Sequence, residues 1–191
     1  MKIVLASSNK HKVQEINDIV KSNGLDVEFI LPPEGFDPIE NGKTFEENSY
    51  IKAKAAWNIT KNWVLADDSG LCIDALNGGP GIYSARYAET PALRIERVLK
   101  ELDGIKDRNA HFSCAMTLLN PKGEVAFKYQ GVCEGAIIEE TRGTNGFGYD
   151  PIFLVKGDTR TMAELSEEEK NQISHRAVAL NQVLLFIKEL L

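Results

Sequence analysis

The chain has 191 residues, of which 43% are hydrophobic and 26% are charged, so it is long enough to bury a core and its composition excludes a disordered protein. Its 28 acidic and 22 basic residues give a net charge of -6, which argues against a sequence-independent nucleic-acid binder. No apolar run approaches the roughly 20 residues of a membrane-spanning helix, so we expect no membrane partner. Three cysteines, far apart and without metal-ligand spacing, predict buried reduced thiols and a cytoplasmic protein.

The chain begins with a predicted strand at residues 3–6, a polar turn at residues 7–9 and a helix. Lys10, His11 and Lys12 fall in the first turn of that helix. The helix dipole disfavours cations there by about 0.3–1 kcal/mol each. Two interpretations remain open: a solvated surface, or a site where backbone N–H groups and lysines bind a phosphate.

A second strand is predicted at residues 27–31, and a proline-rich loop after it presents Glu40. The next helix begins with a capping box from Thr44 to Glu47, so Glu47 is expected to accept backbone N–H groups rather than bind a metal. One face of this helix carries Asn48 and Lys52 among small or apolar residues. Lys52 either extends to water or contacts a phosphate.

An acidic pair follows the apolar residues 63–66. The pattern predicts a buried strand that stops at Asp67 and Asp68, and a turn at Ser69-Gly70 that exposes both carboxylates at the edge of a sheet. Mg²⁺ is usually held by one or two carboxylates with water and phosphate, so the pair suits this ion. Asp-Ser-Gly is also ordinary turn chemistry, and the pair alone does not decide between the two.

The middle of the chain is mostly predicted scaffold. We expect a helix at residues 91–102 and two long strands, at 110–119 and 124–138, joined by a hairpin turn. Near the end, Ser166 and Ser174 are expected to cap two helices. The core stripe of the last helix is predicted to include Val178, Leu185 and Leu190.

The last third carries a second candidate site. Residues 142–151 are glycine-rich but include Phe147 and Asp150, which suits a nucleobase that stacks on the ring and donates to the carboxylate; an aromatic plug of the core is the alternative. His175 and Arg176 stand in the first turn of the final helix, where the dipole disfavours cations.

Taken together, the motifs SSNKHK, TFEEN with Lys52, ADDSGL, GGPGIYSARY, GTNGFGYDPIF and EEKNQISHR resemble the signature set of the inosine triphosphate pyrophosphatases, also called the Ham1 or RdgB family. The resemblance covers essentially the whole chain. Asn145 is a departure, because many members have Gly at that place.

The resemblance implies an α/β fold with an elongated central mixed β-sheet flanked by helices, in one domain at residues 1–191 with a substrate cleft between two lobes. It implies hydrolysis of ITP, dITP and XTP to the monophosphate and pyrophosphate, with Mg²⁺, by a homodimer. It assigns Glu40 and Asp68 to the metal, with Asp67 as a further candidate, and Asp68 to the activation of water.

The same resemblance assigns three groups of residues to the substrate. The triphosphate, the neighbourhood of the reaction and the base would be contacted by Ser7, Ser8, Asn9, Lys10, His11, Lys12, Lys52, Ser69, Phe147, Gly148, Tyr149, Asp150, Lys170, His175 and Arg176. Arg176 and a protonated His175 would donate to a 6-oxo purine and oppose the 6-amino group of adenine.

Two other functions are weighed against this one. A Maf-like nucleotide pyrophosphatase would share the N-terminal strand and Ser-rich turn and would prefer pyrimidine triphosphates, but it has no use for the segment Ser174 to Arg176. A non-hydrolytic nucleotide sensor would bind without activating water. The pair Asp67 and Asp68 argues against the sensor, because added negative charge beside a triphosphate is unfavourable without a metal.

Overall fold

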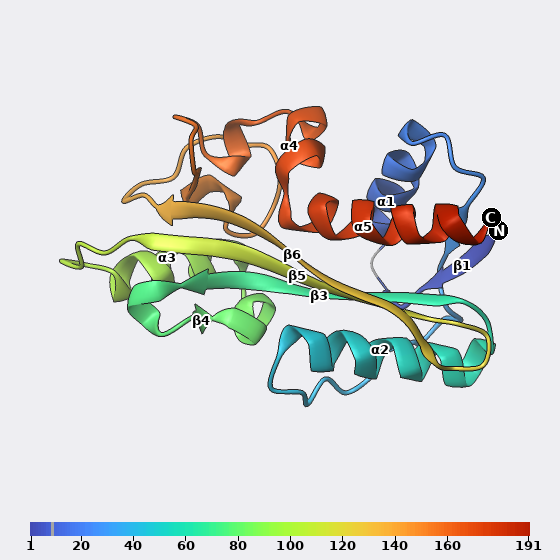
Figure 1. Cartoon of the computed structure of the whole chain (residues 1–191). Helices are drawn as coiled ribbons and strands as arrows, with labels where there is room; N and C mark the ends of the chain where they lie inside the picture. The colour runs from blue at the N-terminus through green and yellow to red at the C-terminus, as the bar shows by residue number, and fades with distance from the viewer. Residues whose placement is uncertain (9) are drawn as a thin grey trace. The chain divides into compact units, whose positions relative to one another are not determined.

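The computed structural model describes residues 1–8 and 10–191, and the side chains of these residues except Lys10, His11 and Glu15. The described chain contains both strands and helices, and its two longest strands follow one another directly (Figure 1). The strands are β1 (Lys2–Leu5), β2 (Glu28–Ile30), β3 (Val64–Ile73), β4 (Gly79–Pro80), β5 (Asn109–Leu119), β6 (Val125–Ile137) and β7 (Phe153–Val155). The α-helices are α1 (Lys10–Ser22), α2 (Phe45–Thr60), α3 (Pro91–Glu101), α4 (Glu167–Ile173) and α5 (His175–Leu190). Short 3-10 helices are η1 (Asp74–Leu76), η2 (Gly81–Arg86), η3 (Asp150–Ile152) and η4 (Met162–Glu164).

The strands form one mixed sheet in the order β2-β1-β3-β5-β6-β7, with β4 paired to β3. Strand β1 runs parallel to both β2 and β3, so that Ile3 lies opposite Phe29 and Leu5 opposite Leu65. Strands β4 and β7 pair antiparallel with β3 and β6. The predicted α/β class with a mixed sheet and flanking helices is therefore confirmed.

The chain divides into two compact units. Unit 1 contains residues 1–68, 114–131 and 178–191, and unit 2 contains residues 69–113 and 132–177. Strands β3, β5 and β6 and helix α5 contribute residues to both units. The prediction of a single domain stays a prediction.

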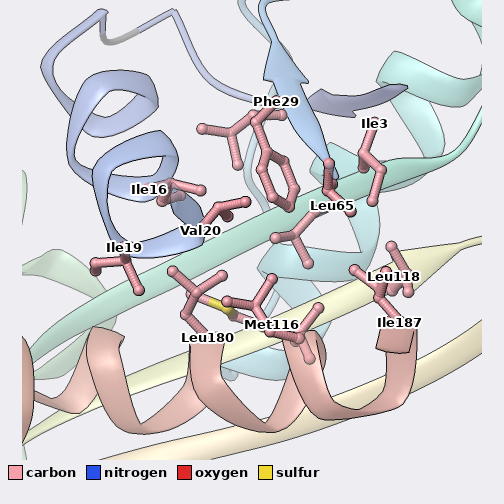
Figure 2. Close-up of a cluster of buried hydrophobic side chains, with 14 of the residues drawn as sticks. Ile3, Ile16, Ile19, Val20, Phe29, Leu65, Met116, Leu118, Leu180 and Ile187 are labelled. Carbon is pink, nitrogen blue, oxygen red and sulfur yellow. The ribbon is translucent and has the colours of Figure 1, made fainter. Parts of the chain in front are cut away.

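Unit 1 has a hydrophobic cluster on each face of its strands. On one face, Leu65 of β3 packs with residues of α1 and α5, among them Ile16, Val20 and Leu180 (Figure 2). On the other face, Val64 and Ala66 pack with Ala53 and Ala56 of α2. Successive side chains of a strand point to opposite faces, and the two clusters follow that alternation along β3.

Unit 2 has a core of its own. Leu71 and Ile73 of β3, Val98 of α3, Phe112 of β5 and Phe153 of β7 are all buried in it. Cys72, Cys114 and Cys133 are buried and unoxidised, as the sequence predicted. Within the described chain, no helix combines the length and apolar character needed to cross a bilayer.

Two sequence predictions about these elements are wrong. The first strand segment does not stop at the acidic pair: β3 continues through Asp67, Asp68, Ser69 and Gly70 to Ile73. The polar residues keep the extended backbone because the strand is paired beyond them, with Cys72 opposite Pro80 of β4. No turn therefore exposes the two carboxylates.

The predicted core stripe of the last helix is also wrong. Leu185 and Leu190 are 56% and 48% exposed, and Val178 is only half-buried. The buried residues of α5 are Ala177, Ala179, Leu180, Val183, Leu184 and Ile187. In this helix leucines occur as neighbours, so the apolar pattern alone fits more than one face.

Candidate active site

Strand β3 sends its two consecutive carboxylates to opposite faces of the sheet. Asp67 is on the same face of the strand as Leu65 and is bound by Lys12 of α1. Asp68 is on the same face as Val64 and Ala66 and lies near Lys52 of α2. The pair therefore makes two separate polar contacts within unit 1, one for each face.

On the first face, Asp67 is 1% exposed and forms an ion pair with Lys12. The Lys12 Nζ atom lies 3.1 Å from Oδ1 and 3.0 Å from Oδ2. A buried carboxylate requires such a partner, because an isolated charge out of water is costly. Lys12, predicted to bind a phosphate, is bound to a carboxylate in this structure.

On the second face, two carboxylates lie close to one ammonium group. The Lys52 Nζ atom lies 3.3 Å from Glu40 Oε2 and 3.5 Å from Asp68 Oδ1. The side chains of Lys52 and Asp68 are each 13% exposed, and that of Glu40 is 33% exposed. The structure thus brings together three of the predicted site residues, from the loop before α2, from α2 and from β3.

The charges in this group act on one another. Burial would lower the pKa of Lys52, but the carboxylates of Asp67, Asp68 and Glu40 outweigh it and raise that pKa above its usual value. Burial raises the pKa of Asp68, with further increases from Glu40 and Asp67, and Lys52 and a hydrogen bond from Asn48 only partly oppose this. Among the described side chains, three carboxylates, those of Glu40, Asp67 and Asp68, therefore act on the charge of Lys52.

Asn48 connects two parts of this cluster, and the sequence analysis did not give it a role. It is 1% exposed, its side chain partly opposes the rise that burial causes in the pKa of Asp68, and it accepts a hydrogen bond from the Gly42 N–H at 2.8 Å. A Cβ atom on Gly42 would lie 2.6 Å from Asn48 Oδ1, so glycine is needed for this approach. The signal available in the sequence was a short polar residue on the apolar face of α2.

The group also fits a divalent cation. Asp68 Oδ2 is buried and has no hydrogen-bond partner among the described residues, and Glu40 lies across the same ammonium group. The described side chains, which exclude those of His11 and Glu15, contain no group of three or more His, Cys, Asp or Glu able to hold a metal. Two carboxylates suit Mg²⁺, which commonly takes its remaining ligands from water and phosphate.

Glu47 has the structural role predicted for it. Thr44 caps α2 by accepting the Glu47 N–H at 3.1 Å, and Glu47 Oε2 accepts the Lys43 N–H at 2.6 Å. These bonds satisfy donors at the start of the helix. The Glu47 side chain is therefore part of the N-terminal cap of α2.

In unit 2, a buried ion pair anchors the glycine-rich loop. Lys170 of α4 donates to Asp150 Oδ2 at 2.6 Å, and the Phe147 N–H donates to the same oxygen at 3.0 Å. Asp150 is 4% exposed and Lys170 is 8% exposed. Gly146 has a φ of +71°, and a Cβ there would lie 2.2 Å from Asp150 Oδ2, so the loop needs glycine to close on the carboxylate.

Phe147 is the exposed aromatic of this loop. Tyr149 and Asp150, which follow it in the loop, are buried, whereas Phe147 is 60% exposed. The Lys170 Nζ atom lies 4.6 Å from the centre of its ring, and the Arg176 Cζ atom lies 5.8 Å from it. An exposed ring held by two cations provides a flat surface on which a planar ligand can stack.

The two basic residues at the start of α5 are almost fully buried in unit 2. His175 is 7% exposed and Arg176 is 2% exposed, and the Arg176 Nη2 atom lies 3.4 Å from Ser69 Oγ. Ser174 caps this helix, as predicted, by accepting the Ala177 N–H at 3.1 Å. Asp150, Lys170, Phe147 and Arg176 thus form one cluster, which the sequence predicted only as separate motifs.

Other predicted substrate residues have different surroundings. Tyr149 is buried, and its hydroxyl donates to the Ser84 carbonyl at 2.8 Å, which makes it a link in the core of unit 2. Gly148 has a φ of +60°. Ser7 and Ser8 follow strand β1; Ser7 is half-buried and Ser8 is exposed. Asn9 and the side chains of Lys10 and His11 lie outside the described residues, so their predicted roles stay predictions.

Comparison with known proteins decides the family. The sequence profile of the Ham1 family matches residues 3–186. The chain belongs to the Ham1 family. This confirms the resemblance stated from the motifs, and the match extends over almost the entire chain.

Individual relatives of this Ham1 family member agree. The dITP/XTP pyrophosphatase of Treponema denticola is 49% identical, over 98% of this chain and 99% of that protein. The solved structure of the Staphylococcus aureus Ham1 protein is 42% identical with a TM-score of 0.90, and that of a HAM1 protein from Coxiella burnetii is 44% identical with the same TM-score. Each of these two alignments covers 99% of this chain and 99% of the solved chain. The fold described above is therefore the fold of the family.

Proposed function

We propose that this Ham1 family member hydrolyses the noncanonical purine nucleoside triphosphates ITP, dITP and XTP to a nucleoside monophosphate and pyrophosphate. The observation that carries the proposal is the 49% identity, over 98% of the chain, to a protein named dITP/XTP pyrophosphatase. The clusters of unit 1 and unit 2 support it, because they provide the two kinds of chemistry that this reaction needs: charge for phosphates, and a stacking surface with donors for a base.

The lysines of unit 1 are the proposed phosphate ligands. Lys12 and Lys52 are both paired with carboxylates, and their side chains are 23% and 13% exposed, so we propose that an incoming polyanion takes the place of the carboxylates at their ammonium groups. Attack on a triphosphate is opposed by the negative charge of its oxygens, which cations must neutralise. Ser7, Ser8, Asn9, Lys10 and His11 are proposed to complete the phosphate site.

Mg²⁺ is the proposed cofactor, with Glu40 and Asp68 as its ligands. The support is the buried Asp68 Oδ2 atom, which has no hydrogen-bond partner among the described residues, and the convergence of both carboxylates on Lys52. When bound, the cation would neutralise phosphate charge that the lysines leave uncompensated. Asp67 is the weaker candidate, because it follows the alternation of the other face of β3 and is bound by Lys12.

Asp68 is the proposed general base. Water would attack the α-phosphorus, the bond from that phosphorus to the bridging oxygen would break, and pyrophosphate would leave, while the Asp68 carboxylate accepts the proton of the water. Burial raises the pKa of Asp68, which brings its basicity closer to the operating pH. Asn48, which hydrogen-bonds to Asp68, would keep this carboxylate in place.

The cluster of unit 2 is the proposed base site. A purine would stack on the exposed ring of Phe147, and the donors of His175 and Arg176 would face its 6-oxo group. Adenine presents a 6-amino group there, which leaves a buried donor unpaired. The carboxylate of Asp150 is already bound by Lys170 and the Phe147 N–H, so we propose that it shapes the loop around the base.

A homodimer, a cytoplasmic location and a single domain complete the proposal. The family resemblance supports the first and the third, and the three reduced, buried cysteines support the second. Gel filtration with light scattering would test the dimer directly, because a mass of one chain in solution would contradict it.

One assay tests the function. Pyrophosphate release is measured with Mg²⁺ from ITP, XTP, dITP, ATP, GTP, UTP and dTTP in parallel, and again with the metal chelated by EDTA. We expect fast release from the first three, little from the others, and none in EDTA until Mg²⁺ is restored in excess. Preference for UTP or dTTP would support the Maf-like function instead, and nucleotide binding without release would support a sensor.

A further inference from the structure

The aromatic side chain beside His175 is not one of the residues that any motif singled out. Phe112 belongs to β5, is 6% exposed, and stacks on the imidazole of His175 with ring centres 4.9 Å apart and an angle of 17° between the planes. Its ring also meets Phe153 of β7, with centres 4.4 Å apart and an angle of 42°. Phe112 thus lies between the core of unit 2 and a residue of the proposed base site.

The stack constrains a side chain whose direction matters. The last torsion of a histidine side chain is soft, so an unsupported imidazole can rotate about it. Both ring nitrogens donate or accept in the plane of the ring. A neighbouring ring that is almost parallel to the imidazole therefore limits the directions in which His175 can donate.

The backbone of His175 is fixed as well. Ser174 accepts the Ala177 N–H at 3.1 Å and donates its own N–H to the Lys170 carbonyl at 2.8 Å, which fixes the first turn of α5. The cap determines where the side chain begins, and Phe112 determines how its ring is turned. Neither alone orients the donor.

We propose that Phe112 is a positioning residue for specificity, whose ring fixes the plane of the His175 imidazole so that it donates to a 6-oxo purine and rejects a 6-amino purine. This rests on the proposed function, in which His175 contacts the base. Sites that pair a buried donor with a substrate oxygen discriminate strongly only when the donor has no alternative direction. Loss of the flat ring should therefore reduce discrimination more than it reduces turnover of ITP.

The test compares three variants with the native chain. The Phe112→Leu substitution keeps an apolar side chain and removes the flat face, the Phe112→Tyr substitution keeps the face, and the Phe153→Leu substitution makes the same chemical change at the neighbouring ring of the same core. The quantity measured is the ratio of kcat/KM for ITP to kcat/KM for ATP. Each preparation supplies both values, so the ratio does not depend on how much of the protein is folded.

We expect Phe112→Leu to lower this ratio by about tenfold, mainly through faster use of ATP, and Phe112→Tyr and Phe153→Leu to keep it within about twofold of the native value. An unchanged ratio in Phe112→Leu would overturn the inference. An equal fall in Phe153→Leu would overturn it too, because the effect would then belong to the core in general.

A second measurement needs no substrate. The imidazole C–H signals of His175, assigned by their loss in His175→Asn, should show the ring-current displacement of a stacked aromatic in the native chain and in Phe112→Tyr, and lose it in Phe112→Leu. Displacement retained in Phe112→Leu would contradict the stack itself. If the native chain releases no pyrophosphate from ITP, the proposed function fails. If it does, and Phe112→Leu still selects ITP as before, only the inference fails.

Discussion

The polar clusters of unit 1 and unit 2 balance their charges in opposite ways. In unit 1, three carboxylates lie around two lysines among the described side chains: Glu40, Asp67 and Asp68 around Lys12 and Lys52. In unit 2, the carboxylate of Asp150 is paired with Lys170, Arg176 lies near an exposed ring, and the buried His175 precedes Arg176 in the chain. An excess of carboxylates calls for a further cation, whereas an excess of donors beside an aromatic ring suits a neutral base with acceptor oxygens.

Burial differs mainly at the two residues that would contact the base. The side chains of Lys52 and Lys12 are 13% and 23% exposed and that of Lys170 is 10% exposed, whereas His175 and Arg176 are 7% and 2% exposed as whole residues. A lysine that binds a phosphate must be able to release its paired carboxylate and bind the incoming phosphate in its place. Discrimination between bases needs donors that are desolvated and held in place before the ligand arrives. We therefore expect changes in unit 1 to affect turnover and phosphate affinity, and changes in unit 2 to affect the choice of base.

The largest effect is expected at Asp68. Replacement by asparagine keeps the shape of the side chain and removes the proton acceptor, so pyrophosphate release should fall by about 10²–10⁴-fold. Binding of ITP, measured by calorimetry, should remain largely intact. The matched control is Asp74→Asn, the same change at an exposed aspartate just after β3, which should turn over normally. Retained turnover in Asp68→Asn would show that Asp68 is not the base. It would also contradict the expectation that changes in unit 1 affect turnover.

A smaller effect is expected at Lys52. Its replacement by glutamine removes a charged donor, and hydrogen bonds to charged groups contribute about 1.5–3 kcal/mol, so KM for ITP should rise by about ten- to a hundredfold. The pKa of Asp68 should rise further, because Lys52 is the group that lowers it most. The ratio of ITP to ATP turnover should stay the same, since both substrates carry the same phosphates.

Lys54 provides the control for this change. It lies two residues along the same helix, where it donates to the Gly123 carbonyl at 3.2 Å and lies 4.2 Å from the centre of the Trp57 ring. Steady-state kinetics of Lys54→Gln should match the native chain. An equal rise of KM in both variants would mean that total charge matters, and that Lys52 has no special place.

A change at Phe147 tests whether the cluster of unit 2 binds the base. Stacking of a base on an aromatic side chain is worth about 1–3 kcal/mol, so Phe147→Leu should raise KM for ITP by about tenfold. The free energy of unfolding should hardly change, because the ring is 60% exposed. Tyr83→Leu is the matched control: Tyr83 is 56% exposed and also lies beneath a cation, with the Arg86 Cζ atom 5.2 Å from its ring centre. Similar KM values for the native chain and Phe147→Leu would exclude stacking as the role of this ring.

The sequence predicted most elements of the fold because their signals are local. Capping residues at Thr44, Ser166 and Ser174 and the apolar periodicity of the first helix were sufficient, and the structure confirms them. Local signals do not predict where strand β3 ends. Its polar residues 67–70 favour a turn by composition, and only pairing with β4 beyond them shows that the strand continues.

The candidate site shows the same limit. Motifs identified Asp68, Lys52 and Arg176, but not that Asp67 and Asp68 project to opposite faces, since this depends on the extended backbone between them. The contact of Phe112 with His175 joins residues 63 positions apart in the chain, and no pattern within one sequence reports such a contact. Asp150 was predicted to accept from a base, whereas its Oδ2 atom accepts from Lys170 and from the Phe147 backbone.

The smallest effect is expected near the surface of unit 2, at a pair of partly exposed groups, of which Arg160 contacts α4. Arg160 donates to both oxygens of Asp158 and to Glu169 Oε1 of α4 at 2.9 Å. Hydrogen bonds from the Arg160 side chain, and then from the backbone, lower the pKa of Asp158 to about 2. In Arg160→Gln that pKa should move part of the way back toward the ordinary value of about 3.9, as the backbone donors remain. Because the folded value is the lower one, the stability that this pair contributes is present above about pH 4 and is lost as the pH falls through 2.

Carbon-detected NMR titration of the Asp158 carboxyl would measure the change, with Lys156→Gln as the control, since Lys156 pairs with Glu134 instead. The ratio of ITP to ATP turnover in Arg160→Gln should equal that of the native chain, because Lys170 is held by its buried contact with Asp150 rather than by the surface pair. If selectivity fell together with the shift in pKa, the base site would depend on surface charges as well as on its buried contacts. The contrast between a prearranged base site in unit 2 and an exchangeable phosphate site in unit 1 would then be lost.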